Sequence, residues 1–190
     1  MPIRNDEDLA QAVAAASQLL QEIQDYAKRD ITKYAKVRFP RGYIRRAAEG
    51  RAKLGFLTTS HHKSNLSYTM LLSDIQHWLL LRTDLSGIAK EMVIKLQIFL
   101  IGSIIESATK IFLKGKCGGH FSKRTEYLET KGIISNQLRI DLDWLWEIRN
   151  RMHLFQLDAN EWLSIDYSVK NHNRVVAAFK GLLDALNNAS

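Results

Sequence analysis

The strongest constraint on the fold is an apolar run at residues 96–105, which lies between Lys95 and Glu106. The run has ten residues and carries no charge. A helix needs about 20 mainly apolar residues to cross a bilayer, so this run predicts a helix buried in a protein core. The chain also has only two prolines among its 190 residues. This scarcity allows long helices, because proline interrupts a helix.

Apolar residues recur at helical spacing through most of the chain, which favours helices over strands. This spacing predicts helices over residues 6–36, 43–53, 67–81, 88–114, 123–131, 135–152 and 168–186. Residues 55–65 are predicted to form a loop, and the glycines within 115–119 to end a helix. We therefore predict an all-α protein. An N-terminal helical region with the basic segment, residues 1–60, precedes an up-and-down helical bundle, residues 61–190.

Positive charge is concentrated in the segment at residues 28–53. This segment holds ten basic and two acidic side chains, whereas the whole chain has a net charge of +7. Aromatic residues are interleaved with the charges, and rings beside cations suit single-stranded nucleic acid through stacking and counterion release. The residues that we predict to contact nucleic acid are Lys33, Lys36, Arg38, Arg41, Arg45 and Arg46. A solvated basic face, or a contact with an acidic protein partner, explains the same charges.

The compartment is predicted from the N-terminus and the cysteine content. The first residues are polar and acidic, whereas a secretory signal begins with a basic stub and an apolar run. Cys117 is the single cysteine, so the chain cannot form an internal disulfide. This favours a reducing compartment and argues against a structural zinc cluster. We predict a cytoplasmic protein without membrane contact, metal site or cofactor.

A short polar motif lies in the aromatic-rich segment at residues 144–155, which is predicted to be helical. Arg149 is followed by Asn150 and, four residues after the arginine, by His153. Residues four apart lie on one face of a helix, about 6 Å apart along its axis. A guanidinium can hold phosphate oxygens while an imidazole transfers protons, which suits phosphodiester chemistry. An arginine and a histidine that only stabilise the fold would show the same spacing.

A second motif lies on the long apolar helix predicted over residues 88–114. Glu106 and Lys110 are four residues apart in the segment Ile-Ile-Glu-Ser-Ala-Thr-Lys. Unpaired charges are costly to bury, so these two side chains either pair with each other or face a cleft. An ordinary helix pair on the solvent side fits the spacing equally well. If the two motif helices pack together, Glu106 and Lys110 would lie near Arg149 and His153.

With these two motifs and an all-helical pattern, the chain resembles the HEPN superfamily of helical bundles over about residues 65–186. Many HEPN proteins are metal-independent endoribonucleases, found in toxin and antiphage systems or paired with nucleotidyltransferases. The resemblance implies that Arg149 binds the scissile phosphate and that His153 is the acid and base. It implies that Asn150 positions a phosphate or the His153 side chain. It implies that Glu106 and Lys110 support the site. It also implies a homodimer with the motifs in one cleft, RNA as substrate, and a cognate nucleotidyltransferase or antitoxin as partner.

The spacing of the arginine and histidine differs from the usual family pattern. Three residues separate Arg149 from His153, whereas the family usually has four to six. On an ideal helix, one residue fewer turns His153 by about 100° relative to a five-apart arrangement. Three hypotheses therefore remain open: a metal-independent ribonuclease, a catalytically silent bundle that binds RNA or a protein, and an interaction protein whose basic segment docks on an acidic partner.

Overall fold

The computed structural model describes residues 2–34, 36–152 and 167–190. Over these residues the chain forms seven α-helices and no strand, which confirms the predicted all-α fold. The chain divides into two compact units, Met1–Pro40 and Arg41–Ser190. The first unit contains one helix, and the second is the helical bundle.

The first unit consists of helix α1, Asp6–Ala27, and the segment that follows it. Asn5 caps the helix, because its side-chain oxygen accepts a 2.8 Å hydrogen bond from the Asp8 backbone N–H. The helix was predicted to continue to residue 36 but ends at Ala27. Lys28 adopts a φ of 51°, outside the helical region. Asp30 then accepts hydrogen bonds from the backbone and hydroxyl of Thr32, which fixes a turn.

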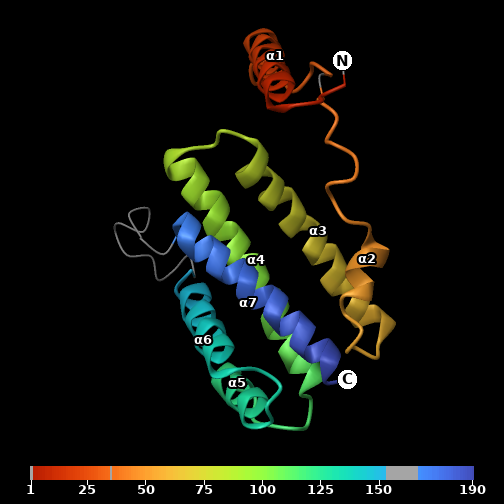
Figure 1. Ribbon diagram of the computed structural model, residues 1–190, viewed down its shortest axis with the longest axis vertical. Coiled ribbons are helices and arrows are strands. Elements are labelled where there is room, and N and C mark those ends of the chain that lie inside the picture. Colours follow the sequence, from red (N-terminus) through yellow and green to blue (C-terminus); the bar gives the residue numbers. More distant parts are fainter. Residues whose placement is uncertain (1, 35, 153–166) are drawn as a thin grey trace. The chain divides into compact units, whose positions relative to one another are not determined.

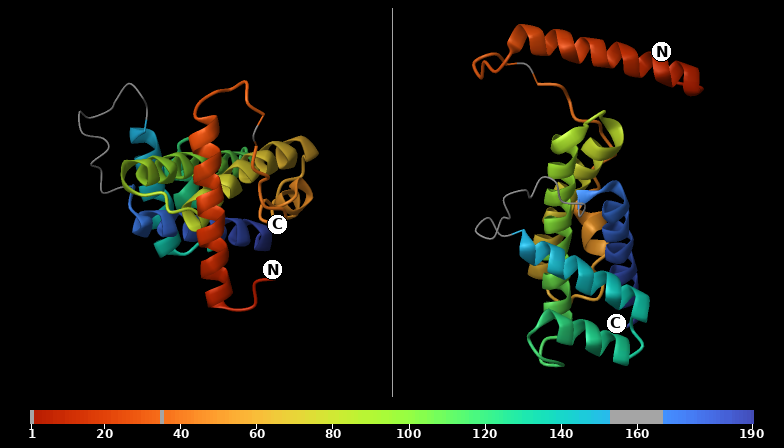
Figure 2. Two further views of the ribbon diagram at one scale, coloured as in Figure 1. Left: turned by 90° about the horizontal axis from the view of Figure 1, so that it is seen from above. Right: turned by 90° about the vertical axis from the view of Figure 1, so that its left-hand side faces the viewer.

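The second unit is a bundle built around helix α4. Its helices are α2 (Ala47–Ala52), α3 (Ser60–Arg82), α4 (Gly87–Phe112), α5 (Phe121–Thr130), α6 (Asn136–Arg151) and α7 (Val169–Asn188). Helices α3, α4 and α7 run side by side along the bundle (Figure 1). A second view shows α6 crossing α4 at a steep angle (Figure 2). Helix α4 contacts α3, α5, α6 and α7, so every large helix of the bundle packs against it.

The core of the bundle follows the apolar run of α4. Ile98, Ile101 and Ile104 have at most 1% of their surface exposed. They pack in one cluster with residues from α6 and α7, including Leu142 and Leu182. This confirms that the apolar run is a core helix. Among the described residues, no helix has both the length and the apolar character that crossing a membrane requires.

The helices predicted from residues 135 and 168 begin directly after Ser135 and Ser168. Ser135 precedes α6 and accepts a hydrogen bond from the Leu138 backbone N–H at 3.2 Å. Ser168 precedes α7 and accepts one from Asn171 at the same distance, 3.2 Å. Gly115 has a φ of 77° just after α4, which a residue with a side chain rarely adopts. The glycine cluster therefore ends the long helix as predicted.

The boundary between the two units differs from the predicted division at residue 60. Residues 41–59 belong to the bundle, because Leu54 and Leu57 are buried in its core. The amide of Asn187 at the end of α7 donates to the Lys53 carbonyl at 2.9 Å and accepts from the Phe56 N–H at 3.2 Å. Helix α3 also begins at Ser60, inside the predicted loop. Leu54 and Leu57 lie after the end of the helix predicted over residues 43–53, so the helical spacing gave no sign of their burial.

Candidate functional site

The two sequence motifs meet where α6 crosses α4. Arg149 on α6 places a guanidinium Nη2 atom 3.1 Å from the Glu106 carboxylate on α4. The stem of Arg149 lies against Gly102, where an added Cβ would come within 3.1 Å of the arginine Cγ. Gly102 and Glu106 are one helical turn apart on the same face of α4. The glycine therefore opens the space through which the arginine reaches the glutamate.

Hydrogen bonds fix the orientation of the Arg149 side chain but do not saturate it. Its Nη1 atom donates to the side-chain oxygen of the neighbouring Asn150 at 3.1 Å. The buried Nε atom has no hydrogen-bond partner among the described residues. The Arg149 side chain is 18% exposed and that of Glu106 is 30% exposed, so the pair is partly open to solvent. A guanidinium has five N–H donors, and several remain for an anion.

Arg149 also belongs to a row of stacked rings and guanidinium groups. Its guanidinium carbon lies 4.9 Å from the Trp146 ring centre and 5.5 Å from that of Phe99. Trp146 stacks on Phe121 of α5, with ring centres 4.6 Å apart and planes 13° apart. Arg124 lies over the other side of the row, 5.4 Å from the Phe121 ring centre. The successive contacts run from Phe99 through Arg149, Trp146 and Phe121 to Arg124. Both arginines of this row contact Glu106.

Arg124 is a site residue that the sequence analysis missed. It is only 4% exposed. Its Nη1 atom donates to the backbone carbonyl of Glu106 at 2.9 Å and to the Thr109 hydroxyl at 3.3 Å. Its Nε atom is buried without a partner among the described residues. Burial lowers the pKa of Arg124, and the charge of Glu106 acts in the opposite direction. The guanidinium nevertheless remains charged at neutral pH.

Glu106 has two arginine neighbours. Arg149 contacts its carboxylate and Arg124 its backbone carbonyl, and each guanidinium has a buried Nε atom without a hydrogen-bond partner among the described residues. Lys110, one turn further along α4, is exposed and adds a third positive charge. Buried cations are stable only with compensating anions and hydrogen bonds. An anion with several acceptor oxygens, such as a phosphate, has the chemistry that would complete this site.

The predicted acid and base, His153, lies outside the described residues. Helix α6 ends at Arg151, and Met152 follows as its C-cap. The placement of His153 beside Arg149 therefore stays a prediction. The structure does bring together Arg149, Asn150 and Glu106. Of the alternatives left open for Glu106, the structure shows a pair with Arg149 of the other motif helix.

The six residues predicted to bind nucleic acid fall into both units. Lys33, Lys36 and Arg38 belong to the first unit, and the other three belong to the bundle. Arg45 is held by the buried carboxylate of Asp74, with Nε 2.7 Å from one oxygen and 3.0 Å from the other. Arg46, in contrast, is 87% exposed and bonded only loosely to Glu49, at 3.5 Å. The basic segment thus mixes structural and solvent-facing cations.

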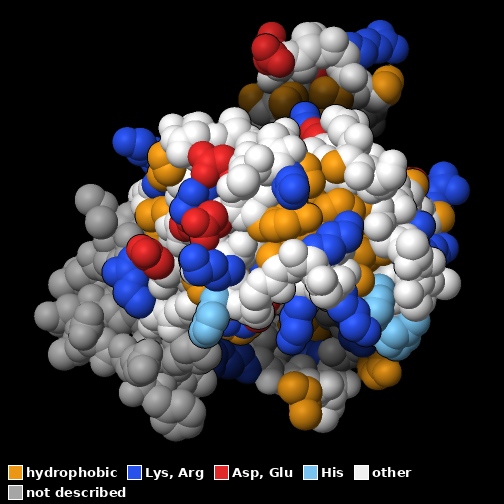
Figure 3. Space-filling model, turned by 90° about the horizontal axis from the view of Figure 1, so that it is seen from below, with side chains coloured by type: hydrophobic (Ala, Val, Ile, Leu, Met, Phe, Trp, Pro, Cys, Tyr) orange, Lys and Arg blue, Asp and Glu red, His pale blue; other side chains and the backbone are white. Residues whose placement is uncertain are grey.

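Basic side chains are also found on the end of the bundle seen from below. Lys and Arg side chains lie there around a central group of hydrophobic side chains (Figure 3). At residue level, Lys116 lies over the Phe112 ring with its Nζ atom 4.7 Å from the ring centre. Pairs of a cation and a ring therefore also occur in the bundle outside residues 28–53.

A second polar cluster lies inside the bundle, away from the Arg149 motif. His172 of α7 shares a 2.7 Å hydrogen bond with Gln97 of α4, and its ring centre is 5.9 Å from that of His77. Burial lowers the pKa of both imidazoles. His77 also lines a cavity of about 270 Å³ with Arg45 and Lys180. The histidines hold helices together with neutral rings, which is a structural role.

The fold and the site together define an all-α helical bundle. It holds a pair of an arginine and a carboxylate beside an aromatic stack where α4, α5 and α6 meet. Comparisons with protein-family models, with curated proteins and with solved structures find no match for this chain. The function of the chain is therefore inferred from the geometry of the site.

Proposed function

We propose that this chain is a metal-independent endoribonuclease of the HEPN type that binds the scissile phosphate at Arg149. The observation that carries the proposal is the 3.1 Å ion pair between Glu106 and Arg149. These residues come from the two motifs on which the family resemblance depends. Two motifs that form one site must lie in contact. Two short motifs that occur by chance would have no reason to be in contact.

The proposed reaction uses the RNA 2′-hydroxyl as the nucleophile. His153 accepts the hydroxyl proton while the oxygen attacks phosphorus, and the bond to the 5′-oxygen breaks as that oxygen takes up a proton. The products are a 2′,3′-cyclic phosphate and a 5′-hydroxyl. Arg149 stabilises the charge that develops on the phosphate, with Glu106 and Asn150 fixing the guanidinium in advance. Lys110 supports the phosphate from the same helix face.

The supply of RNA to this site is proposed to depend on solvent-facing cations of the basic segment. Lys36, Arg38, Arg41 and Arg46 are exposed. Lys36 also lies over the Tyr34 ring, with Nζ 5.4 Å from the ring centre. Cations beside rings attract a single strand by charge and stacking. The same proposal includes a cytoplasmic homodimer with the motifs of both copies in one cleft, and a cognate nucleotidyltransferase or antitoxin as regulator.

The test is incubation of the purified protein with a labelled structured RNA in EDTA. Arg149→Ala and His153→Ala are expected to abolish cleavage while helicity is unchanged. Arg174→Ala is the matched control, because Arg174 pairs with Asp141 and lies 4.0 Å over the Trp144 ring but is outside the motifs. Cleavage that survives in the His153 variant, or RNA that stays intact with the unaltered protein, would contradict the proposal.

A catalytically silent RNA-binding bundle is the second candidate. One observation favours it: both guanidinium groups of the site are held by hydrogen bonds and rings, as suits a fixed phosphate-binding surface. This function predicts binding that weakens steeply with salt and yields no product. Arg149→Ala would then lower the affinity for RNA, whereas His153→Ala would leave it unchanged.

A further inference from the structure

Helix α1 carries a wide apolar stripe that its own unit does not cover. Small and large apolar residues recur at spacings of three and four along one side of the helix. They are Leu9, Ala12, Val13, Ala16, Leu19, Leu20, Ile23, Tyr26 and Ala27. No residue of α1 is buried, and it is the only helix that the structure describes within residues 2–34 and 36–40. A stripe of this width is typical of a helix that packs against another helix.

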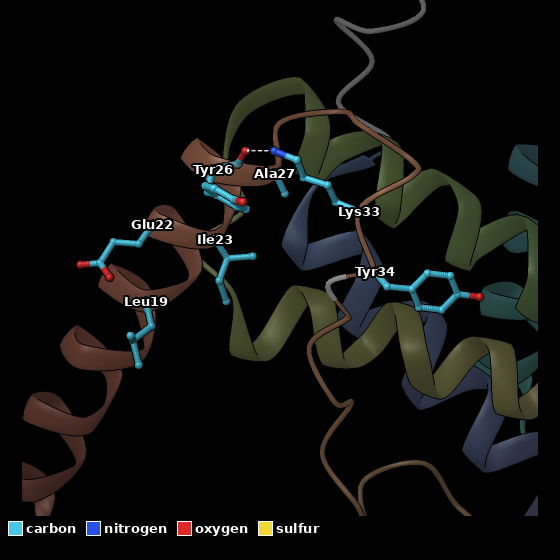
Figure 4. A pocket seen from close by; sticks show the side chains of 7 residues that line it. All are labelled: Leu19, Glu22, Ile23, Tyr26, Ala27, Lys33 and Tyr34. Carbon is cyan, nitrogen blue, oxygen red and sulfur yellow. Dashed lines mark hydrogen bonds between the residues drawn. The ribbon is translucent and has the colours of Figure 1, made fainter.

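The stripe ends in a hollow beside the segment that follows the helix. This pocket measures about 480 Å³ and is lined mainly by apolar side chains from the last turns of α1 and by Lys33 and Tyr34. Figure 4 shows Leu19 and Ile23 on the same side of the helix, and Lys33 reaching back to the Tyr26 carbonyl. Glu22 also lines the hollow, which is therefore apolar along the helix and carries one acidic and one basic side chain at its edge.

The sizes of the stripe residues change from one end of α1 to the other. The first half contributes Leu9 and the smaller Ala12, Val13 and Ala16, and the second half contributes Leu19, Leu20, Ile23 and Tyr26. Two parallel copies would place the large side chains of the second half opposite one another, and Ala12 and Ala16 opposite their own counterparts. Antiparallel copies centred near residue 18 instead place Ala16 opposite Leu20 and Leu9 opposite Ala27, which keeps the helix spacing more even.

The charges along α1 follow the same gradient. The first turn holds Asp6, Glu7 and Asp8, and the helix contains no basic residue. Residues 28–38, which follow at the other end, contain five basic side chains and one acidic side chain. Antiparallel copies centred near residue 18 bring the acidic first turn of one copy level with the end of the other copy's α1, where Lys28 begins the basic segment. Parallel copies would instead align like charges at both ends.

The polar side of α1 argues against a membrane surface as the occupant. Helices that lie on membranes generally carry Lys and Arg on the polar face, which attract anionic lipids. The polar face of α1 carries glutamines and acidic residues, among them Gln18, Gln21, Glu22 and Asp25. In addition, Gln18 and Gln21 donate to Glu22 and Asp25 along the helix, which keeps this face solvated.

We propose that α1 binds the α1 of a second copy of this chain, in antiparallel orientation, with Leu9 of each copy entering the hollow beside Ile23 and Tyr26 of the other. This contact is separate from the cleft proposed for the Arg149 motif and does not depend on ribonuclease activity. Helix α1 has 22 residues, which is short for a pairing helix. The dimer is therefore expected to dissociate at low micromolar concentration.

The first test is sedimentation of the full chain, without RNA, over a range of micromolar concentrations. The double variant Leu19→Ala with Ile23→Ala is expected to weaken association through α1 by about 100-fold or more, because it removes apolar surface from both copies. Association through the bundle cleft should be the same in the variant and in the unaltered chain. The double variant Gln18→Ala with Gln21→Ala is the matched control on the opposite face, and self-association should stay unchanged. A chain that is monomeric throughout, or a stripe variant that associates normally, would overturn the proposal.

The second test measures orientation by spin labels. Cys117→Ser removes the only cysteine, and Glu7→Cys then provides a single labelling position near the start of α1. Antiparallel copies place the two labelled backbones about 33 Å apart, whereas parallel copies place them about 10 Å apart. A distance near 33 Å that disappears in the stripe variant supports the proposal. A distance near 10 Å would refute the antiparallel pairing.

Discussion

Gly102 lies directly under the stem of Arg149, where a Cβ atom would come within 3.2 Å of the arginine Cβ and 3.1 Å of its Cγ. These are stem atoms, which have less freedom to move aside than the far end of the side chain. The glycine therefore sets how closely α6 approaches α4, and with it whether the guanidinium reaches Glu106. Substitutions at this one position separate packing from helix propensity.

We expect Gly102→Ala to gain little stability although alanine favours helix by about 1 kcal/mol over glycine. Crowding against Arg149 should offset most of that gain. At Gly181 an added Cβ would meet only Leu138, at 3.4 Å, which is ordinary contact. Gly181→Ala should therefore stabilise the bundle by about 0.5–1 kcal/mol. Thermal unfolding of the two variants measures the difference, and equal gains would contradict the close approach at Gly102.

Replacing the carboxylate of the site should affect both stability and ligand binding. Glu106→Gln keeps the size of the side chain but leaves Arg149 and Arg124 without the compensating charge. We expect a loss of about 1–2 kcal/mol in the free energy of unfolding, between the values for exposed and buried pairs. Inorganic phosphate should restore part of it, because an anion can replace the carboxylate.

The control for this substitution is Glu126→Gln, which removes the carboxylate of an exposed ion pair with Lys123. Its unfolding should be nearly unchanged, and phosphate should have no added effect. Chemical denaturation with and without phosphate measures both variants. If Glu106→Gln and Glu126→Gln respond alike, the charges around Glu106 do not form an anion site.

Local patterns predicted the helices well, and long-range contacts explain most of what they missed. The caps at Ser135 and Ser168 depend on residues three positions away, so they were readable from the sequence. The sequence left the partner of Glu106 open between Lys110 on the same helix and groups across a cleft, and only the packing of α6 on α4 shows that it is Arg149. Arg124 carried no signal at all, because its role arises only when α5 packs beside α4.

The basic segment shows the same limit on a smaller scale. Charge counts treat Arg45 and Arg46 alike, although Asp74 holds the first and the second is open to solvent. The partner of Arg45 is on a different helix, and only the fold brings it close. Composition therefore predicted where the cations lie along the chain, but not which of them are free to meet a ligand.

The buried histidines make the bundle sensitive to acid. Burial lowers the pKa of His77 and of His172 from the ordinary value of 6.5; nearby, Asp74 opposes the shift of His77 while Arg45 adds to it. Between these lowered pKa values and 6.5 the unfolded chain binds more protons than the folded one. The free energy of unfolding therefore increases with pH over that range. We expect the midpoint of thermal unfolding to be highest above pH 6.5 and to fall as the pH drops below it.

Two variants assign this pH dependence to the buried cluster. His172→Gln retains a side chain that can bond to Gln97 and removes a titrating group, so the slope below pH 6.5 should become smaller. His61→Gln, on the exposed start of α3, should leave the slope unchanged. Unfolding midpoints between pH 5 and pH 8 measure the slopes. An unchanged slope in the His172 variant would assign the effect to other groups.

The two kinds of cation in the basic segment should respond oppositely to neutralisation. Arg45→Gln removes the partner of a carboxylate that is only 5% exposed, that of Asp74. We expect it to cost about 3 kcal/mol of stability, as is usual for breaking a buried pair.

Lys36→Gln and Arg46→Gln change exposed side chains and should leave unfolding almost unchanged. Their RNA affinity should fall, and the dependence of log affinity on log salt should become shallower by nearly one for each phosphate that the variant no longer neutralises. Denaturation and RNA binding at several salt concentrations, measured on the same preparations, separate the two effects. A stable Arg45 variant, or exposed-residue variants with an unchanged salt slope, would refute this division of the segment.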